Sequence, residues 1–457
     1  MASWSTQLSD LIAPAVAKSA VTDAVLVGRG TLAETGRLAG QITDRRAALV
    51  MADSAGFGAA GRAVVDRLAA SGFAVETLIL PNQPLPKSSV EEAETFRAAL
   101  AASPDLFPVS VGSGVINDLV KWAAFETDRR YLSVATAASM DGYTSAGAPL
   151  AKDGFKVTIP TRAPIAMLAD LDVIAAAPPE MNGWGYGDLA GKIPAGGDWL
   201  LADAIGVEPL DDVAWPMVQD NLRYWLAGHD GIADGDPDAV ARLFVGLTAV
   251  GFAMEFHGSS RPASGADHQI AHMWEMEGLN HHGQKVSHGA AVSIGCVLSL
   301  ALFDWLIAQD LSAIDPVRIA EAAPDLGARE AALAKAISDP MVARKARDEL
   351  RAKHVQGTAH IDRLTKLKTA WPGLRDRLER HLMRSTDMAA MLRQAGAPSY
   401  PSDIGLGRAH VRRTLRAAGY IRRRYTIFDL LEEIGQTENA FDAVTCGLSI
   451  SPAEATI

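Results

Sequence analysis

Short apolar runs alternate with amphipathic stretches through the first third of the chain. Residues 24–28 (AVLVG) and 47–51 (AALVM) are two such runs, and residues 31–42 between them carry apolar positions at helical spacing. This pattern predicts the order strand, helix, strand. The alternation continues with strands predicted at 74–80, 107–111 and 132–135 and helices at 61–70, 90–102 and 115–126. It predicts a parallel sheet covered on both faces, with ligands at the carboxyl ends of its strands.

After Pro178 and Pro179 the strand pattern stops and helical periodicity takes over. Helices are predicted at 197–205, 217–226, 238–256, 268–277, 290–309, 316–323, 328–337, 339–354, 360–369, 374–395, 408–420 and 427–433. Asp339 before Pro340 fits an N-cap followed by proline at the first helical position. We therefore expect a Rossmann-like α/β domain at residues 1–178 and an all-α domain at 179–457.

Composition narrows the class of protein. With 457 residues and 48% hydrophobic composition the chain has room for two cores, at roughly 150 residues per domain. The formal charge of -11 argues against a nucleic-acid or anionic-membrane binder, because such partners attract clustered Lys and Arg. We also expect the basic run at 408–424 to pair with carboxylates on a helix face.

Cysteine usage and apolar runs bear on location. Cys296 and Cys446 lie far apart, so we expect no disulfide scaffold and a cytoplasmic protein. The first twenty residues lack the pattern of a secretory signal. The uncharged run at 290–303 is shorter than the ~18 residues of a membrane span, so it predicts a buried helix and no membrane span.

Three features of the predicted sheet fit a dinucleotide. Gly112-Ser113-Gly114 lies between a strand and a helix, where backbone N–H groups favour a phosphate, although a structural turn has the same sequence. Asp53 ends the second strand, where a carboxylate accepts ribose hydroxyls and favours NAD over NADP, although a solvated aspartate is equally consistent. Residues 136–145 form a loop of small and hydroxyl side chains that fits a nicotinamide or any turn.

Residues 259–289 hold five of the eleven histidines of the chain. His268 and His272 are four residues apart and share a helix face. One histidine from this helix, one from the segment after it and one carboxylate would give a catalytic zinc three ligands and an open position. Asp188, which follows a run of alternating glycines at 183–187, is the carboxylate that fits best. His272 is a ligand, an orienting residue or a substrate contact, and spacing does not decide among these.

The remaining polar residues of this region receive weaker assignments. His257, His281 and His288 are interpreted as neighbours of the metal site. Arg261 and Lys285 are cations that would hold an anionic group of a substrate, or are simply solvated charges.

Four stretches resemble the glycerol-1-phosphate dehydrogenases, within the superfamily of iron-containing alcohol dehydrogenases, glycerol dehydrogenases and dehydroquinate synthases. They are VGSGVINDLVK (111–121), SVATAASMDGYTS (133–145), GWGYGDLAGK (183–192) and SSRPASGADHQIAHMWEM (259–276), which leads into HGQKV (282–286). The sequence departs from the family pattern at Ser113, where many members have glycine, and at Ala135, where proline is common. The helices around 310–370 are longer than the family leads us to expect, and the sequence assigns them no role.

The resemblance implies roles for particular residues, with the active site in the cleft between the two domains. A metal, usually zinc and in some relatives nickel or iron, would be held by Asp188, His268 and His282. Asp141, Asp188 and His272 would contact the substrate, and His272 would join the metal ligands as a catalytic residue. NAD or NADP would be bound by Asp53, Gly112, Ser113, Gly114, Val115, Ile116, Thr136, Ala137, Ala138, Ser139 and Ser145.

The function that the resemblance implies is hydride transfer between NAD(P) and a phosphorylated triose, interconverting dihydroxyacetone phosphate and sn-glycerol 1-phosphate in a homo-oligomer. Three alternatives are open: a polyol dehydrogenase acting on glycerol, a dehydroquinate-synthase-like lyase, and a non-catalytic nucleotide-binding protein. The lyase branch generally has glutamate where Asp188 stands, and the presence of all three proposed ligands argues against a non-catalytic protein.

Overall fold

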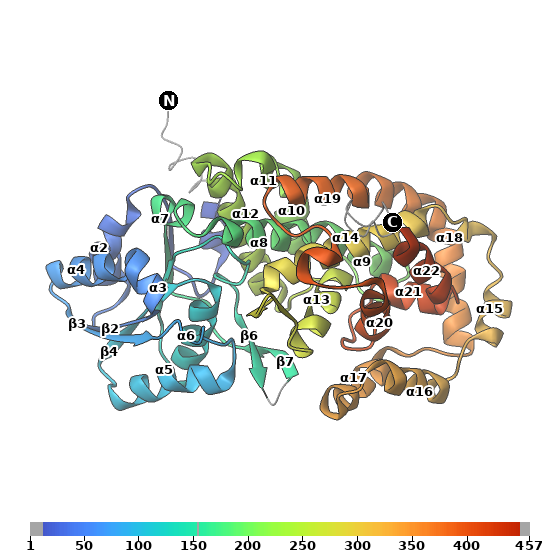
Figure 1. The fold of residues 1–457 in the computed structure, drawn as a ribbon, viewed down its shortest axis with the longest axis horizontal. Helices are drawn as coiled ribbons and strands as arrows, with labels where there is room; N and C mark the ends of the chain where they lie inside the picture. The colour runs from blue at the N-terminus through green and yellow to red at the C-terminus, as the bar shows by residue number, and fades with distance from the viewer. Residues whose placement is uncertain (1–11, 153–154, 448–457) are drawn as a thin grey trace. The chain divides into compact units, whose positions relative to one another are not determined.

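The computed structural model describes residues 12–152 and 155–447, and these fall into two compact units (Figure 1). The sheet unit comprises the chain up to Leu189 together with Pro216–Ser260. The helical unit comprises Ala190–Trp215 together with the chain from Arg261 onward.

A parallel sheet of six strands forms the centre of the described part of the sheet unit, as the sequence predicts. The strands are β1 (Ala24–Gly28), β2 (Ala47–Asp53), β3 (Ala74–Leu80), β4 (Leu106–Gly112), β5 (Leu132–Ala135) and β8 (Ala166–Asp170), in the spatial order β1-β8-β5-β4-β2-β3. β8 was not predicted from the sequence, and it pairs with both β1 and β5. The antiparallel hairpin of β6 (Gly147–Lys152) and β7 (Phe155–Pro160) was not predicted either.

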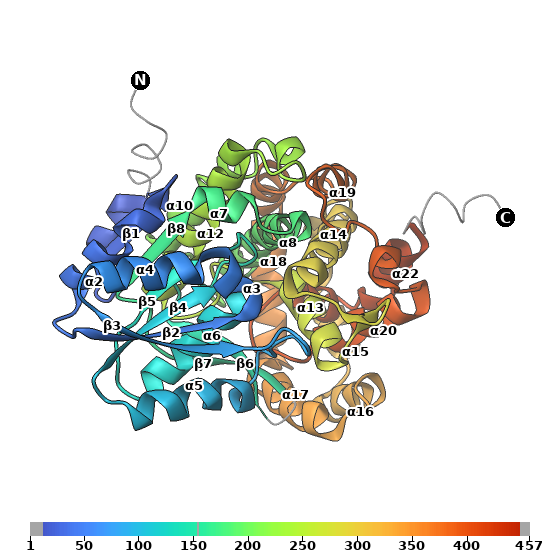
Figure 2. The ribbon, with the colours of Figure 1, turned by 60° about the vertical axis from the view of Figure 1, so that its left-hand side comes forward.

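Helices pack on both faces of this sheet because successive side chains of a strand point to opposite faces. In β2, Val50 packs with Leu38 of α2 (Thr35–Ile42) and Val64 of α4 (Arg62–Ala70) in one buried cluster. Met51 packs with Phe96 of α5 (Val90–Ala102) in another cluster, which also includes residues of α6 (Gly114–Glu126). Figure 2 shows α2 and α4 on one side of the strands and α5 on the other.

Shorter helices and one long helix complete the sheet unit. They are η1 (Thr31–Glu34), α3 (Ser54–Gly56), η2 (Phe57–Gly61), α7 (Leu171–Ala175), α8 (Pro179–Ala190), α10 (Ala214–Gln219), α11 (Leu222–Trp225), η3 (His229–Gly231) and α12 (Pro237–His257). The last residues of α8 and the first of α10 lie at the limits of the unit.

The described part of the helical unit is almost entirely α-helical. Its elements are α9 (Lys192–Ala204), α13 (Ala266–Met276), β9 (Asn280–His281), β10 (Gln284–Lys285), α14 (His288–Ile307), η4 (Leu311–Ala313), α15 (Pro316–Ala322), α16 (Leu326–Ala336), α17 (Pro340–Lys353), α18 (Thr358–His381), α19 (Ser385–Gln394), η5 (Pro401–Ile404), α20 (Arg408–Ala418), α21 (Ile427–Glu433) and α22 (Thr437–Gly447). The predicted cap of α17 is confirmed, since the Asp339 carboxylate accepts hydrogen bonds from the N–H groups of Met341 at 2.8 Å and Val342 at 2.9 Å.

The predicted break between the helices at 360–369 and 374–395 is wrong. The chain forms one helix through Pro372 and breaks only after His381, so that α18 is 24 residues long. Proline normally ends a helix because it removes one hydrogen bond and crowds the preceding turn. Here the apolar stripe that contains Trp371 and Leu374 is buried along α18, and this packing compensates for the lost bond.

Among the helices around 310–370, to which the sequence assigns no role, α18 packs against α9, and α17 and α18 both contact α21. In α17, Lys353 Nζ lies 2.6 Å from a carboxylate oxygen of Asp429 in α21. In α18, Arg363 forms an ion pair of 2.5 Å with Glu433 at the other end of α21. Helices α17 and α18 therefore hold α21 in place through these two ion pairs.

Two helices, α12 and α14, are long and apolar enough to cross a membrane by composition alone. α14 begins at His288 and is 20 residues long, so the sequence-based argument from length does not hold. In each helix 78% of the most apolar window is buried within the protein, which is typical of core helices.

Candidate metal and nucleotide site

The predicted nucleotide-binding residues gather at the carboxyl ends of three adjacent strands. β5, β4 and β2 are neighbours in the sheet, and they end at Ala135, Gly112 and Asp53. The N–H of Thr136 donates to the Gly112 carbonyl at 3.1 Å, which links the loop after β5 to the turn after β4. This edge of a parallel sheet is where nucleotides bind in doubly wound folds.

Asp53 caps α3 as well as ending β2. One carboxylate oxygen accepts the N–H of Gly56 at 2.7 Å, and the other accepts the side-chain amide of Asn82 at 3.0 Å. Gly56 lies so close to β4 that a Cβ atom there would stand 2.8 Å from the Val111 carbonyl oxygen. The carboxylate is therefore held in a fixed orientation beside the turn after β4.

The turn at 112–114 needs its glycines for reasons within the protein itself. A Cβ atom on Gly112 would stand 2.7 Å from the Cβ of Ile116, and one on Gly114 would stand 2.4 Å from Met140 Cγ. α6 begins at Gly114, with Ser113 as its N-cap residue in extended conformation. A helix N-terminus of this kind also favours a phosphate, so the turn fits either role.

A buried lysine holds the loop at 136–145. Lys121 of α6 donates from Nζ to the carbonyls of Gly142 at 2.6 Å and Gly147 at 3.1 Å, and to Ser145 Oγ at 3.3 Å. Its ion-pair partner is Asp118, at 3.2 Å. Burial lowers the pKa of Lys121 and raises that of Asp118, and each charge opposes the shift of the other. The sequence did not single out this pair, because a lysine in a helix usually indicates a solvated face.

α8 packs directly against the same loop. A Cβ atom on Gly185 would stand 1.7 Å from the carbonyl oxygen of Ala138, so only glycine allows this approach. Asp188 follows in the last turn of α8 and is fully buried. Its carboxylate accepts the N–H of Asp141 at 3.0 Å, which ties the candidate substrate-binding residue Asp141 to the candidate metal ligand.

Three histidine rings cluster where α13 and α14 meet. His268 and His272 lie one turn apart on α13, with ring centroids 5.9 Å apart. His288, the first residue of α14, lies 5.3 Å from His268 and 5.8 Å from His272, again between ring centroids. From the sequence, His288 is expected only to be a neighbour of the metal site.

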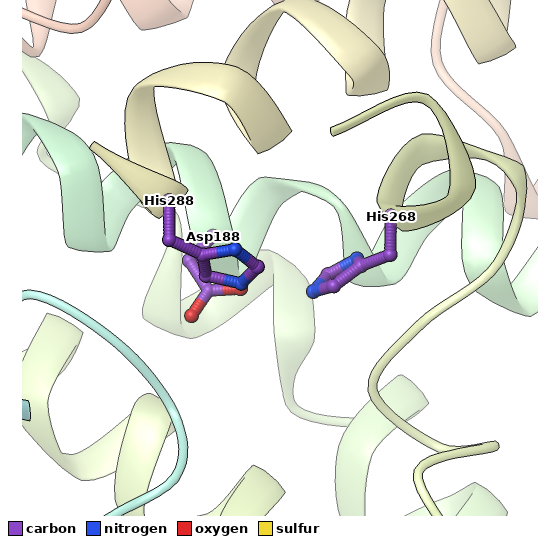
Figure 3. Close-up of side chains that lie close together, drawn as sticks. All are labelled: Asp188, His268 and His288. Carbon is purple, nitrogen blue, oxygen red and sulfur yellow. The ribbon is translucent and has the colours of Figure 1, made fainter. Parts of the chain in front are cut away.

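Asp188, His268 and His288 each offer one ligand atom, and these three atoms lie within 4.8 Å of one another. In Figure 3 the two imidazole rings point toward each other, with the Asp188 carboxylate beside His288. One carboxylate and two imidazoles match the ligand set of a catalytic zinc that keeps an open position. A second group of His272, Glu275 and His288 meets the same distance limit.

Both histidines of the first group are also held in the way metal ligands usually are. His268 Nδ1 lies 2.6 Å from Asp267, and His288 Nδ1 lies 2.5 Å from Glu275. When Nδ1 of an imidazole bonds to a carboxylate, Nε2 is the nitrogen that faces a metal. The donor set and its supporting carboxylates therefore fit a divalent transition metal.

His282, which the resemblance suggested as the third ligand, does not belong to this group. It is exposed on the turn between β9 and β10, has a φ of 51°, and its ring centroid lies 3.9 Å from that of His281. Both His282 and His288 follow α13 in sequence. His288 begins α14, which packs along α13, whereas the hairpin carries His282 toward solvent.

Arg261, one of the two cations near the cluster in sequence, has structural partners. Arg261 is buried, donates to the carbonyls of Tyr425 and Asp198 at 3.0 Å each, and forms an ion pair of 3.1 Å with Glu208. Lys285 is exposed on β10. The expected pairing of the basic run at 408–424 is confirmed by contacts of Arg412 and Arg416 with Glu438 and of Arg423 with Glu349.

Comparison with known proteins identifies the fold class. A family model described as iron-containing alcohol dehydrogenase matches residues 26–178. A crystal structure of a probable glycerol dehydrogenase from Sinorhizobium meliloti 1021 superposes with a TM-score of 0.59 at 17% identity, covering 93% of this chain and 97% of that one. Glycerol dehydrogenase from Schizosaccharomyces pombe gives 0.57 at 14% identity, covering 93% and 91%. At such low identity these structures show a shared fold only.

Sequence relatives define the family more closely. The chain is 31% identical over 376 residues to glycerol-1-phosphate dehydrogenase [NAD(P)+] of Bacillus subtilis (strain 168), covering 82% of each protein. It is 29% identical to the protein of the same name from Bacillus velezensis, covering 84% of this chain and 85% of the relative. The chain belongs to the glycerol-1-phosphate dehydrogenase family.

Proposed function

We propose that the protein is a metal-dependent, NAD(P)-linked oxidoreductase that interconverts dihydroxyacetone phosphate and sn-glycerol 1-phosphate. The substrate and the nucleotide follow from the names of the relatives. The observation that carries the proposal is the grouping of Asp188, His268 and His288, because these side chains offer a metal one carboxylate and two imidazoles.

In this proposal Asp188, His268 and His288 hold zinc, or nickel or iron in its place. When bound, such an ion supplies a Lewis acid that polarises a carbonyl oxygen. His288 thus replaces His282 in the ligand set.

The protein's own side chains orient the substrate and move a proton. His272 lies on the same face of α13 as His268, with its ring 5.9 Å away, and we assign it to proton exchange with the C2 oxygen of the substrate. Asp141 is assigned to a substrate hydroxyl, because its backbone N–H already bonds to Asp188. The nucleotide, when bound, would supply or accept the hydride at C2, and the protein contributes orientation and charge.

The nucleotide is assigned to the carboxyl edge of the sheet. The turn from Gly112 to Ile116 would carry the phosphates, the loop from Thr136 to Ser139 together with Ser145 would contact the nicotinamide ribose, and Asp53 would bind the adenosine ribose. The positions of Gly112, Thr136 and Asp53 at the ends of adjacent strands support this assignment.

The test is a steady-state assay of metal-loaded protein with sn-glycerol 1-phosphate, sn-glycerol 3-phosphate and glycerol, each with NAD and with NADP. The proposal predicts the highest kcat/KM for sn-glycerol 1-phosphate. A preference for glycerol would reassign the protein as a polyol dehydrogenase, and a preference for the 3-phosphate would reverse the assigned stereochemistry.

A further inference from the structure

Two carboxylates on α13 each contact one of the metal-binding histidines. Asp267 contacts His268 of the same helix, and Glu275, two turns further on, contacts His288 at the start of α14. Both carboxylates are shielded, since the Asp267 side chain is fully buried and that of Glu275 is 6% exposed. A shielded carboxylate beside an imidazole forms a strong, charge-assisted hydrogen bond.

We propose that Glu275 is a positioning residue that selects Nε2 of His288 as the metal-binding nitrogen, and that it is not itself a ligand. The inference rests on the metal site of the proposed function. Glu275 also belongs to the alternative group with His272 and His288, in which it would bind a metal directly. The two roles exclude each other at Nδ1 of His288, because a nitrogen that shares a proton with Glu275 cannot donate its lone pair to a metal.

The geometry around His288 favours the positioning role. The 2.5 Å distance from Nδ1 to the Glu275 carboxylate is that of a hydrogen bond, which fixes the ring orientation and raises the basicity of Nε2. Ser287, the N-cap of α14, accepts the N–H of Ala290 at 3.2 Å and so fixes the backbone that carries His288. The His288 ring is thus fixed in two ways, by the capped backbone at the start of α14 and by the hydrogen bond between Nδ1 and Glu275.

Two arginines from a distant segment interact electrostatically with these carboxylates, Arg422 with Glu275 and Arg424 with Asp267. Arg422 and Arg424 are alternate residues of a non-helical stretch, whereas Arg423 between them points outward to Glu349. Arg424 donates to the Ser264 carbonyl at 2.6 Å, just before α13 begins. Burial lowers the pKa of Arg422, and the carboxylates of Glu349 and Glu275 oppose that shift. Glu275 therefore has the Arg422 guanidinium near it as well as the imidazole of His288.

Glu275 is a better test residue than Asp267. The Asp267 side chain also accepts the N–H of Gly265 at 2.9 Å, and a Cβ atom on Gly295 would stand 2.3 Å from the Asp267 carbonyl oxygen. Replacing Asp267 would therefore disturb the start of α13 in addition to His268. Glu275 lies in the last turn of the helix, where its removal leaves the backbone bonds intact.

The same helix provides a matched control. Glu277, the C-cap residue of α13, contacts His410 at 2.7 Å, so it is also a carboxylate paired with an imidazole. His410 belongs to neither metal-binding group of the described residues. The variant Glu277→Gln removes a comparable pair from the same element without reaching the metal site.

The experiment measures zinc affinity by chelator competition and the visible spectrum of the cobalt-loaded full-length protein, for wild type, Glu275→Ala, Glu275→Gln and Glu277→Gln. We expect Glu275→Ala to bind zinc about 10–100-fold more weakly, the range typical of lost partners of metal-binding histidines. Glu275→Gln should lose less, because its amide oxygen accepts the same hydrogen bond without the charge. Glu277→Gln should match wild type, and every variant should keep one cobalt per chain with a four-coordinate spectrum.

Two results would overturn the inference. A cobalt spectrum that reports a lost ligand in Glu275→Ala would make Glu275 a ligand, and wild-type zinc affinity in both Glu275 variants would leave it no role at the metal. If Glu275→Ala does not fold, as judged by thermal unfolding of the metal-free protein, wild-type affinity in Glu275→Gln alone overturns the proposal. These readouts do not use turnover, so a protein that binds zinc as expected but does not oxidise sn-glycerol 1-phosphate would contradict only the proposed function.

Discussion

Two regions are built in opposite ways: the histidine cluster, and the edge of the sheet at the carboxyl ends of β5, β4 and β2, where we propose that the nucleotide binds. At the edge, close backbone approach sets the shape, as at Gly56 against β4 and Gly185 against Ala138. At the cluster, charged side chains set the shape, because His268 and His288 each bond to a buried carboxylate. The edge is suited to a large ligand that meets many N–H groups, and the cluster to one compact cation.

This difference predicts how each region responds to substitution. At a backbone-shaped edge, added volume should push the contacting backbones apart, and the buried pair of Lys121 and Asp118 makes the adjoining loop sensitive to charge as well. A charge-shaped cluster should tolerate small changes of volume and fail when one partner is removed.

The largest effect is expected at His288. His288→Ala removes a proposed metal ligand and should lower kcat/KM by at least about 10³-fold, because Lewis-acid stabilisation is worth several kcal/mol. His282→Ala is the matched control and should retain activity, since His282 is exposed on the β9–β10 turn. The measurement is kcat/KM together with zinc content. Loss of zinc in His282→Ala but not in His288→Ala would restore the ligand set suggested by the resemblance.

Lys121→Met tests whether the edge also depends on charge. It leaves Asp118 buried without its partner, and removal of one member of a buried pair costs about 3–5 kcal/mol. The unfolding free energy from denaturant titration should fall by that amount, and replacing both residues by apolar ones should restore most of it. Lys87→Met, at an exposed lysine, should have little effect. An unchanged stability in Lys121→Met would show that backbone packing alone holds the loop.

Titration of the buried Asp198 should make the free energy of unfolding of the helical unit depend on pH. Its carboxylate accepts the N–H groups of Ala266 and Ile427 at 2.7 Å each, the first residues of α13 and α21. Burial raises its pKa from 3.8 to about 7. Because the folded pKa exceeds the unfolded one, the associated stability is complete below pH 3.8 and is lost as the pH rises toward 7.

The matching experiment compares wild type with Asp198→Asn across this window. The difference in unfolding free energy should fall by about 3 kcal/mol between pH 5 and pH 7, at 1.36 kcal/mol per pH unit. Thermal unfolding at both pH values measures it. A difference that stays constant would mean that the two helix N-termini keep Asp198 charged throughout.

The smallest effect is expected from added volume at the edge. Gly185→Ala places a methyl group against the Ala138 carbonyl and should cost about 1–3 kcal/mol as α8 and the loop separate. KM for the nucleotide should rise more than KM for sn-glycerol 1-phosphate. Gly58→Ala is the control, because no atom lies within 4 Å of a Cβ atom at Gly58. Equal behaviour of both variants would refute the backbone-shaped edge.

The sheet could be predicted where its signals are local. Runs such as AVLVG and AALVM, each followed by a turn and a helix, predicted the strands β1 to β5. β8 was missed because it follows a hairpin and is recognised only by its pairing with β1 and β5. The single helix α18 was missed because Pro372 is a local break signal that tertiary packing overrides.

The sequence predicted which residue types form the candidate site, but not which of these residues lie together. The spacing of His268 and His272 placed both on one helix, and the glycine run pointed to Asp188. The choice between His282 and His288 depends on where the β9–β10 hairpin ends and α14 begins, which the sequence of 280–290 does not reveal. Glu275 and Lys121 were missed for the same reason, since their partners are set by packing between helices and loops.

X-ray absorption at the zinc edge of the zinc-loaded, full-length protein shows directly whether Asp188, His268 and His288 hold the ion. We expect nitrogen and oxygen ligands at about 2.0–2.2 Å, with the outer-shell scattering of two imidazoles. Loss of one imidazole in His288→Ala and none in His282→Ala would complete that result. A shell without imidazole, or one that loses an imidazole only in His282→Ala, would contradict it.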